Sequence, residues 1–84
     1  MSKIPQVSGR QVVKALSKIG YEKDRQKGSH IVLRQKAYPH RRIVVPDHKE
    51  IAKGTLRKII KQAGLTIEEF QRLLKKVIIT GKRG

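Results

Sequence analysis

Hydrophobic residues recur every three or four positions near the start of the chain, which is the spacing of one face of a helix. They are Val12, Leu16 and Ile19, with Val13 and Ala15 beside them. Ser8 and Gln11 have the spacing of a capping box, in which each side chain satisfies a backbone N–H at the helix start. Gly20 follows the last apolar residue and suits the left-handed position after a helix. The pattern predicts a first helix over residues 9–19.

Short stretches separated by turn residues come next. Residues 21–26 are polar and form a weak strand, whereas residues 30–35 and 42–45 are rich in Ile, Val and Leu. The connections between them are too short for helical crossovers, so the three strands are expected to pair as an antiparallel meander. One face of such a sheet can stay open to a ligand.

The second strand alternates between its two faces. Ile31 and Leu33 share one face, and His30, Val32 and Arg34 share the other. If helices cover the face of Ile31 and Leu33, the His30 ring points outward.

Helical spacing returns in the second half of the chain. Apolar positions over residues 54–63 predict a second helix that ends at Gly64. Thr66 and Glu69 form another capping box, and the apolar residues after them predict a third helix with Phe70 in the core.

The predicted fold class is α+β, in the order helix, three-stranded antiparallel sheet, helix and C-terminal helix. We expect one domain over residues 1–84, because no repeat or linker divides the chain. The basic extension over residues 75–84 fits three alternatives: more of the third helix, an edge strand, or a contact with a second subunit.

Charge narrows the choice of partners. The chain has 21 Lys and Arg against 6 Asp and Glu, for a formal net charge of +15, so the expected partner is a polyanion or an acidic protein. Charge alone does not separate nucleic acid from a membrane surface. However, no apolar run approaches the roughly 20 residues of a membrane-spanning helix, and the first residues lack the apolar core of a secretory signal. We therefore expect a cytoplasmic protein without a membrane partner.

The tripeptide Gly28-Ser29-His30 carries the candidate chemistry. Histidine can donate or accept a proton near neutral pH, and here it enters a strand among cations that attract phosphate. RNA supplies its own nucleophile, the 2′-hydroxyl, so its cleavage can proceed by acid–base catalysis without a metal ion. The few carboxylates are scattered, and no metal site or cofactor is predicted. His40 is expected to be a solvated loop residue, and for His48 we favour a structural role.

Cations in two places are expected to contact RNA phosphates. Near His30 they are Lys27, Arg25 and Arg34, together with the turn residues Gly28 and Ser29. On one side of the first helix they are Arg10, Lys14 and Lys18, which recur every four residues.

Four short motifs in order along residues 3–74 resemble the HicA (YcfA-like) mRNA interferase toxin family. They are Val7-Ser8-Gly9-Arg10, Gly28-Ser29-His30, Val45-Pro46-Asp47-His48 and Gly54-Thr55-Leu56-Arg57-Lys58-Ile59-Ile60. The resemblance implies a fold like that of double-stranded RNA-binding domains, cleavage of mRNA with His30 as the catalytic residue, and a HicB antitoxin partner.

Three functions follow from these observations. The leading hypothesis is a metal-independent endoribonuclease, the toxin of a type II toxin–antitoxin pair. The alternatives are a non-catalytic RNA-binding module with a similar fold, and a basic structural protein of a ribonucleoprotein particle.

Overall fold

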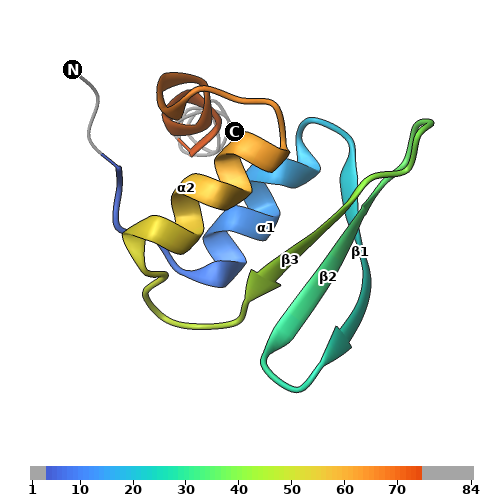
Figure 1. The fold of residues 1–84 in the computed structure, drawn as a ribbon, viewed down its shortest axis with the longest axis horizontal. Coiled ribbons are helices and arrows are strands. Elements are labelled where there is room, and N and C mark those ends of the chain that lie inside the picture. The colour runs from blue at the N-terminus through green and yellow to red at the C-terminus, as the bar shows by residue number, and fades with distance from the viewer. Residues whose placement is uncertain (1–3, 75–84) are drawn as a thin grey trace, which may run out of the picture.

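An antiparallel sheet with helices packed on one of its faces forms the molecule (Figure 1). The computed structural model describes residues 4–74 of the 84-residue chain. A further helix spans residues 67–74, as the sequence predicts. The predicted α+β fold, including its order of elements, is therefore confirmed. The labelled elements are α1 (Gly9–Ser17), β1 (Tyr21–Lys27), β2 (His30–Gln35), β3 (Arg42–Pro46) and α2 (Lys53–Gln62).

Helix α1 begins at the predicted capping box. Ser8 Oγ accepts a hydrogen bond from the Gln11 backbone N–H at 3.1 Å, and the Ser8 N–H donates to Gln11 Oε1 at 2.8 Å. The helix ends at Ser17, two residues before the predicted end, and the chain turns through Gly20 at φ +99°. A residue with a Cβ rarely adopts this φ, which explains the glycine.

The strands pair in the order β1-β2-β3. Ile31 and Leu33 of β2 are buried, while His30 is exposed, so the alternation predicted along this strand is confirmed. In β1 the register shifts between Lys23 and Arg25, which leaves Asp24 as the extra residue of a β-bulge.

The core lies between the sheet and the helices. A second capping box starts the helix over residues 67–74, with Thr66 N–H donating to Glu69 Oε1 at 2.8 Å and Glu69 N–H donating to Thr66 Oγ1 at 3.0 Å. This helix carries Phe70 into the core, as predicted. The side chains with no more than 1% exposure from these layers include Val12, Leu16, Leu33, Ile43, Val45, Leu56 and Phe70.

The alternatives for residues 75–84 lie outside residues 4–74. None of the helices in residues 4–74 has both the length and the hydrophobicity that a transmembrane segment needs.

Candidate nucleic-acid interface

His30 stands at one end of the sheet, on its middle strand. It is the first residue of β2 and pairs with Lys27 on β1 and with Pro46 on β3. The turn before it passes through Gly28 at φ +57°, a conformation that favours glycine. The His30 side chain is exposed, so it can meet a ligand without any rearrangement of the core.

Asp47 holds the turn that precedes His30. Its backbone N–H donates to the Ser29 carbonyl at 2.7 Å, and its carboxylate accepts from Gln26 Nε2 at 3.1 Å. Gln26 Nε2 also donates to the Gly28 carbonyl at 3.1 Å, and Arg10 Nε lies 3.4 Å from the other Asp47 oxygen. The end of β3, the β1–β2 turn and the start of α1 are thus joined by one polar network.

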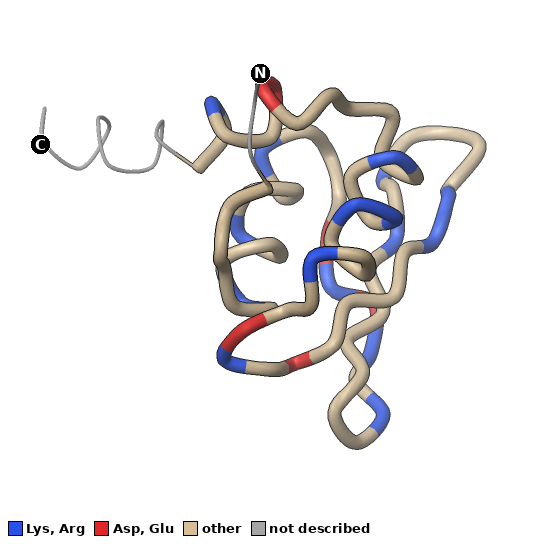
Figure 2. Tube along the Cα trace, turned by 60° about the vertical axis from the view of Figure 1, so that its left-hand side comes forward, with Lys and Arg blue, Asp and Glu red and all other residues tan. Residues whose placement is uncertain are grey.

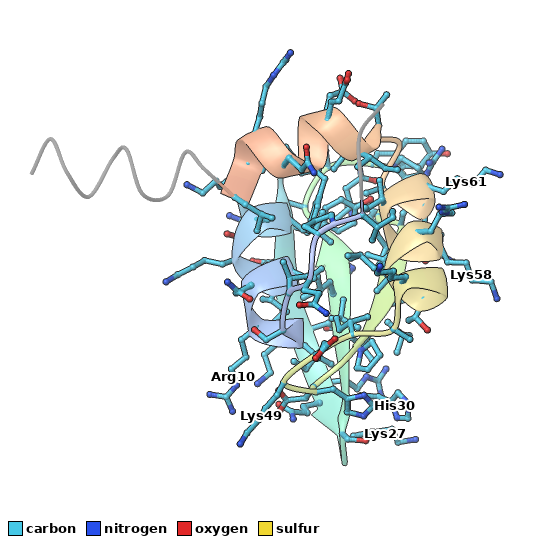
Figure 3. All side chains as sticks on the ribbon, turned by 90° about the vertical axis from the view of Figure 1, so that its left-hand side faces the viewer. Arg10, Lys27, His30, Lys49, Lys58 and Lys61 are labelled. Atoms are coloured by element: carbon cyan, nitrogen blue, oxygen red, sulfur yellow. The ribbon has the colours of Figure 1, made fainter. Side chains whose placement is uncertain are left out.

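Close packing at Gly9 brings the start of α1 to this same end of the sheet. The Gly9 N–H donates to the His48 carbonyl at 2.9 Å. A Cβ on Gly9 would overlap the carbonyl oxygen of Pro46, so only glycine fits this contact. Figure 3 shows the result, with Arg10, Lys27 and His30 at one end of the molecule.

Arg10 lines two open pockets, with volumes of about 280 and 300 Å³. His30 lines neither pocket. Its chain neighbour Ile31 lines one of them, and Asp47, which follows the His30 partner Pro46, lines the other. The first is lined by Arg10, Val13, Lys23, Gln26 and Ile31, and the second by Ser8, Arg10, Asp47, His48 and Lys49.

The predicted phosphate contacts on the sheet lie at different distances from His30. Lys27 is its direct neighbour across the strand pair, and Gly28 and Ser29 are in the adjoining turn. Arg34 lies four residues farther along β2, about 13 Å at the usual strand rise, and is only partly exposed. Arg25 pairs with Val32 and is exposed.

Asp24 reduces the positive charge of the open sheet face. Its carboxylate lies 3.8 Å from Arg25 Nε and 3.7 Å from Arg42 Nε. Because both arginine side chains are largely exposed, each ion pair adds little to stability. Asp24 nevertheless lowers the local attraction for phosphate near Arg25.

The predicted row on α1 leads away from His30. Arg10 lies at the same end of the molecule as His30, but Lys14 and Lys18 follow at about 6 and 12 Å along the helix axis. All three side chains are exposed. The structure therefore places only the first member of this row beside the candidate site.

The other two histidines differ from each other in their surroundings. His40 lies in the β2–β3 loop, as predicted, but it is only partly exposed and its Nδ1 lies 3.2 Å from the Gln35 carbonyl, so it is less solvated than predicted. Its ring and that of Tyr38 form a T-shaped pair, with ring centroids 6.2 Å apart. His48 has an exposed side chain, and its structural contribution is its backbone carbonyl, which accepts the hydrogen bond from the Gly9 N–H.

Sequence reasoning missed two parts of this surface. Gln26 and Asp47 are brought within hydrogen-bond distance only by the register of the strands, although Asp47 belongs to the motif Val45-Pro46-Asp47-His48. The cations of α2 were also missed, and their signal was visible: three Lys or Arg and no acidic residue within the predicted helix over residues 54–63, with Lys53 just before it.

No three side chains of His, Asp or Glu within residues 4–74 are grouped closely enough to hold a metal ion. The functional groups at the site are the exposed imidazole of His30, that of His48 beyond Pro46, nearby ammonium and guanidinium groups, and a turn fixed by Asp47.

Comparison with known families agrees with the motifs. A sequence model of the family described as "HicA toxin of bacterial toxin-antitoxin" matches residues 9–65, a stretch that includes Gly9, His30, Asp47 and the whole of α2. A comparison with individually curated proteins gave no significant match. Because the family model covers more than half of the 84 residues, the chain belongs to the HicA toxin family of bacterial toxin–antitoxin systems.

Proposed function

We propose that this HicA family member is a cytoplasmic endoribonuclease that cleaves mRNA without a metal ion, and that His30 is its catalytic residue. The observation that carries the proposal is the exposed His30 ring at the end of the sheet, beside a turn held by Asp47. Family membership and a net charge of +15 support RNA as the substrate.

The proposed reaction uses the RNA's own 2′-hydroxyl. Its oxygen attacks the neighbouring phosphorus while a base removes its proton, and the bond from phosphorus to the 5′ oxygen breaks as an acid protonates that oxygen. The products are a 2′,3′-cyclic phosphate and a 5′-hydroxyl. His30 would perform one of the two proton transfers, and Lys27, its neighbour across the strand pair, would stabilise the charge that develops on the phosphate.

Incubation of the purified protein with RNA in excess chelator tests this proposal. We expect cleavage to continue, with fragments that end in a cyclic phosphate, because no step needs a metal ion. Binding without cleavage, under these conditions and with added Mg²⁺ or Mn²⁺, would instead favour the RNA-binding module. Failure to bind RNA would contradict the endoribonuclease and the RNA-binding module alike.

The antitoxin is proposed to be a HicB-like acidic protein that covers His30 and blocks RNA directly. Opposite charge should speed its association, and added salt should slow it. In an NMR titration with the antitoxin, we expect the ring resonances of His30 to change in step with the loss of cleavage. If these resonances stay constant at saturation while cleavage stops, the antitoxin acts at another place.

A further inference from the structure

We infer that RNA bound at His30 continues along α2, where exposed lysine and arginine side chains hold its phosphates. This inference rests on the proposed function and deepens it, because it assigns the path of the substrate beyond the reacting phosphate. The residues of this α2 row are Lys53, Arg57, Lys58 and Lys61.

The α2 row has a regular geometry. Lys53, Arg57 and Lys61 are four residues apart, so they lie along one side of the helix, and Lys58 lies next to Arg57. The row extends about 12 Å at the usual rise per residue. All four side chains are exposed, while the opposite side of the helix buries Leu56, Ile59 and Ile60 in the core.

The α2 row lies on the His30 side of the molecule. Pro46, which pairs with His30, is followed by a short connection that leads into α2 at Lys53. Figure 3 shows Lys58 and Lys61 projecting on the same side as His30, with Arg10 on the other side. A strand of RNA can therefore pass from His30 to α2 without crossing the start of α1.

The charge of the α2 row is also less compensated than that of α1. Within residues 4–74 the ion pairs join Arg10 to Asp47, and Arg25 and Arg42 to Asp24, and none of them uses a cation of α2. In Figure 2 the colour of Lys and Arg recurs along this helix without an acidic segment between. Uncompensated cations on one face attract a polyanion most strongly.

The aromatic residues favour phosphate contacts over base stacking. Tyr21 and Phe70 are buried, at 3% and 0% exposure, and cannot receive a base. Tyr38 is exposed, but it lies in the β2–β3 connection, at the other end of β2 from His30. Binding that depends on cations releases counterions and falls steeply with salt.

Two matched pairs of substitutions test the path. In a His30→Ala background, where cleavage does not interfere, Lys58→Gln with Lys61→Gln is compared with Lys14→Gln and Lys18→Gln. Both pairs remove two exposed lysines from a helix or its C-cap, and glutamine preserves helix propensity. The affinity for a short single-stranded RNA of mixed sequence is measured over a range of salt concentrations.

We expect the α2 pair to flatten the plot of log affinity against log salt by about 1.4, because each lost phosphate contact contributes roughly 0.7 on single strands. The α1 pair should change the slope by less than half as much. In the protein with intact His30, the α2 pair should raise KM for RNA and leave kcat within about twofold, because the lost contacts act on binding.

An unchanged slope for the α2 pair, or an equal change for the α1 pair, overturns the inference. If the α2 pair leaves RNA binding intact but weakens association with the acidic antitoxin, the row is a protein-binding surface instead. These results are independent of catalysis, because the binding assay uses an inactive background. Loss of the proposed function would show separately, as absence of cleavage by the parent protein.

Discussion

Replacement of His30 with alanine is expected to lower the rate of RNA cleavage by about 10²–10⁴-fold, the usual contribution of a general acid or base. The side chain is exposed and contributes nothing to the buried core, so the variant should fold and retain its affinity for RNA. Single-turnover cleavage rates in excess chelator, together with circular dichroism and RNA binding, measure these three properties.

His48→Ala is the matched control for this substitution. His48 is also exposed and lies just beyond Pro46, the residue that pairs with His30, but its structural contribution comes from its backbone carbonyl. We expect this variant to cleave RNA within a few fold of the parent rate. A folded His30→Ala protein with parental activity would remove His30 from the mechanism, and an equal loss in both variants would overturn the assignment of His30 alone by showing that His48 also takes part in cleavage.

Much of the fold could be predicted because its signals are local. Ser8 with Gln11, and Thr66 with Glu69, each satisfy backbone groups only three residues away, so their spacing alone identifies a helix start. The outward direction of His30 followed equally from alternation within one strand, once helices could be assigned to the opposite face.

The environment of His30 could not be predicted because it depends on contacts between distant segments. Asp47 reaches Gln26 across 21 positions and Arg10 across 37, and only the paired register brings these side chains together. The bulge at Asp24 likewise has no local signal in a polar strand. These contacts decide how the turn before His30 is held, yet each residue alone resembles an ordinary surface residue.

The same limit applies to the positions of the two basic helices. Spacing in the sequence shows that Arg10, Lys14 and Lys18 lie on one side of a helix, but it gives no direction relative to His30. That direction depends on how α1 and α2 pack on the sheet. The structure places α1 over β1 and β3, and α2 against β3, and only then do the two rows of cations acquire different relations to the candidate site.

Gly9→Ala is expected to destabilise the protein by about 1–3 kcal/mol or more, the usual cost of overpacking a close contact. The added methyl group would overlap the Pro46 carbonyl oxygen, which is backbone and cannot rotate away. Helix α1 must then move from the end of β3. That movement would disturb the hydrogen bond from Gly9 to His48 and the polar network around Asp47, so cleavage should also weaken.

Gly54→Ala is the matched control, because it changes a glycine in the first turn of the other labelled helix. A Cβ on Gly54 meets no atom within 4 Å, so alanine should be neutral or stabilise the protein by up to about 1 kcal/mol through its higher helix propensity. Urea unfolding of both variants measures the difference in their stability. Cleavage rates measured without urea show whether the Gly9→Ala substitution also disturbs the geometry of His30. Equal stability of the two variants would mean that α1 does not need close contact with Pro46. A destabilised Gly9→Ala protein with parental cleavage, when folded, would show instead that the position of α1 and the geometry of His30 are independent.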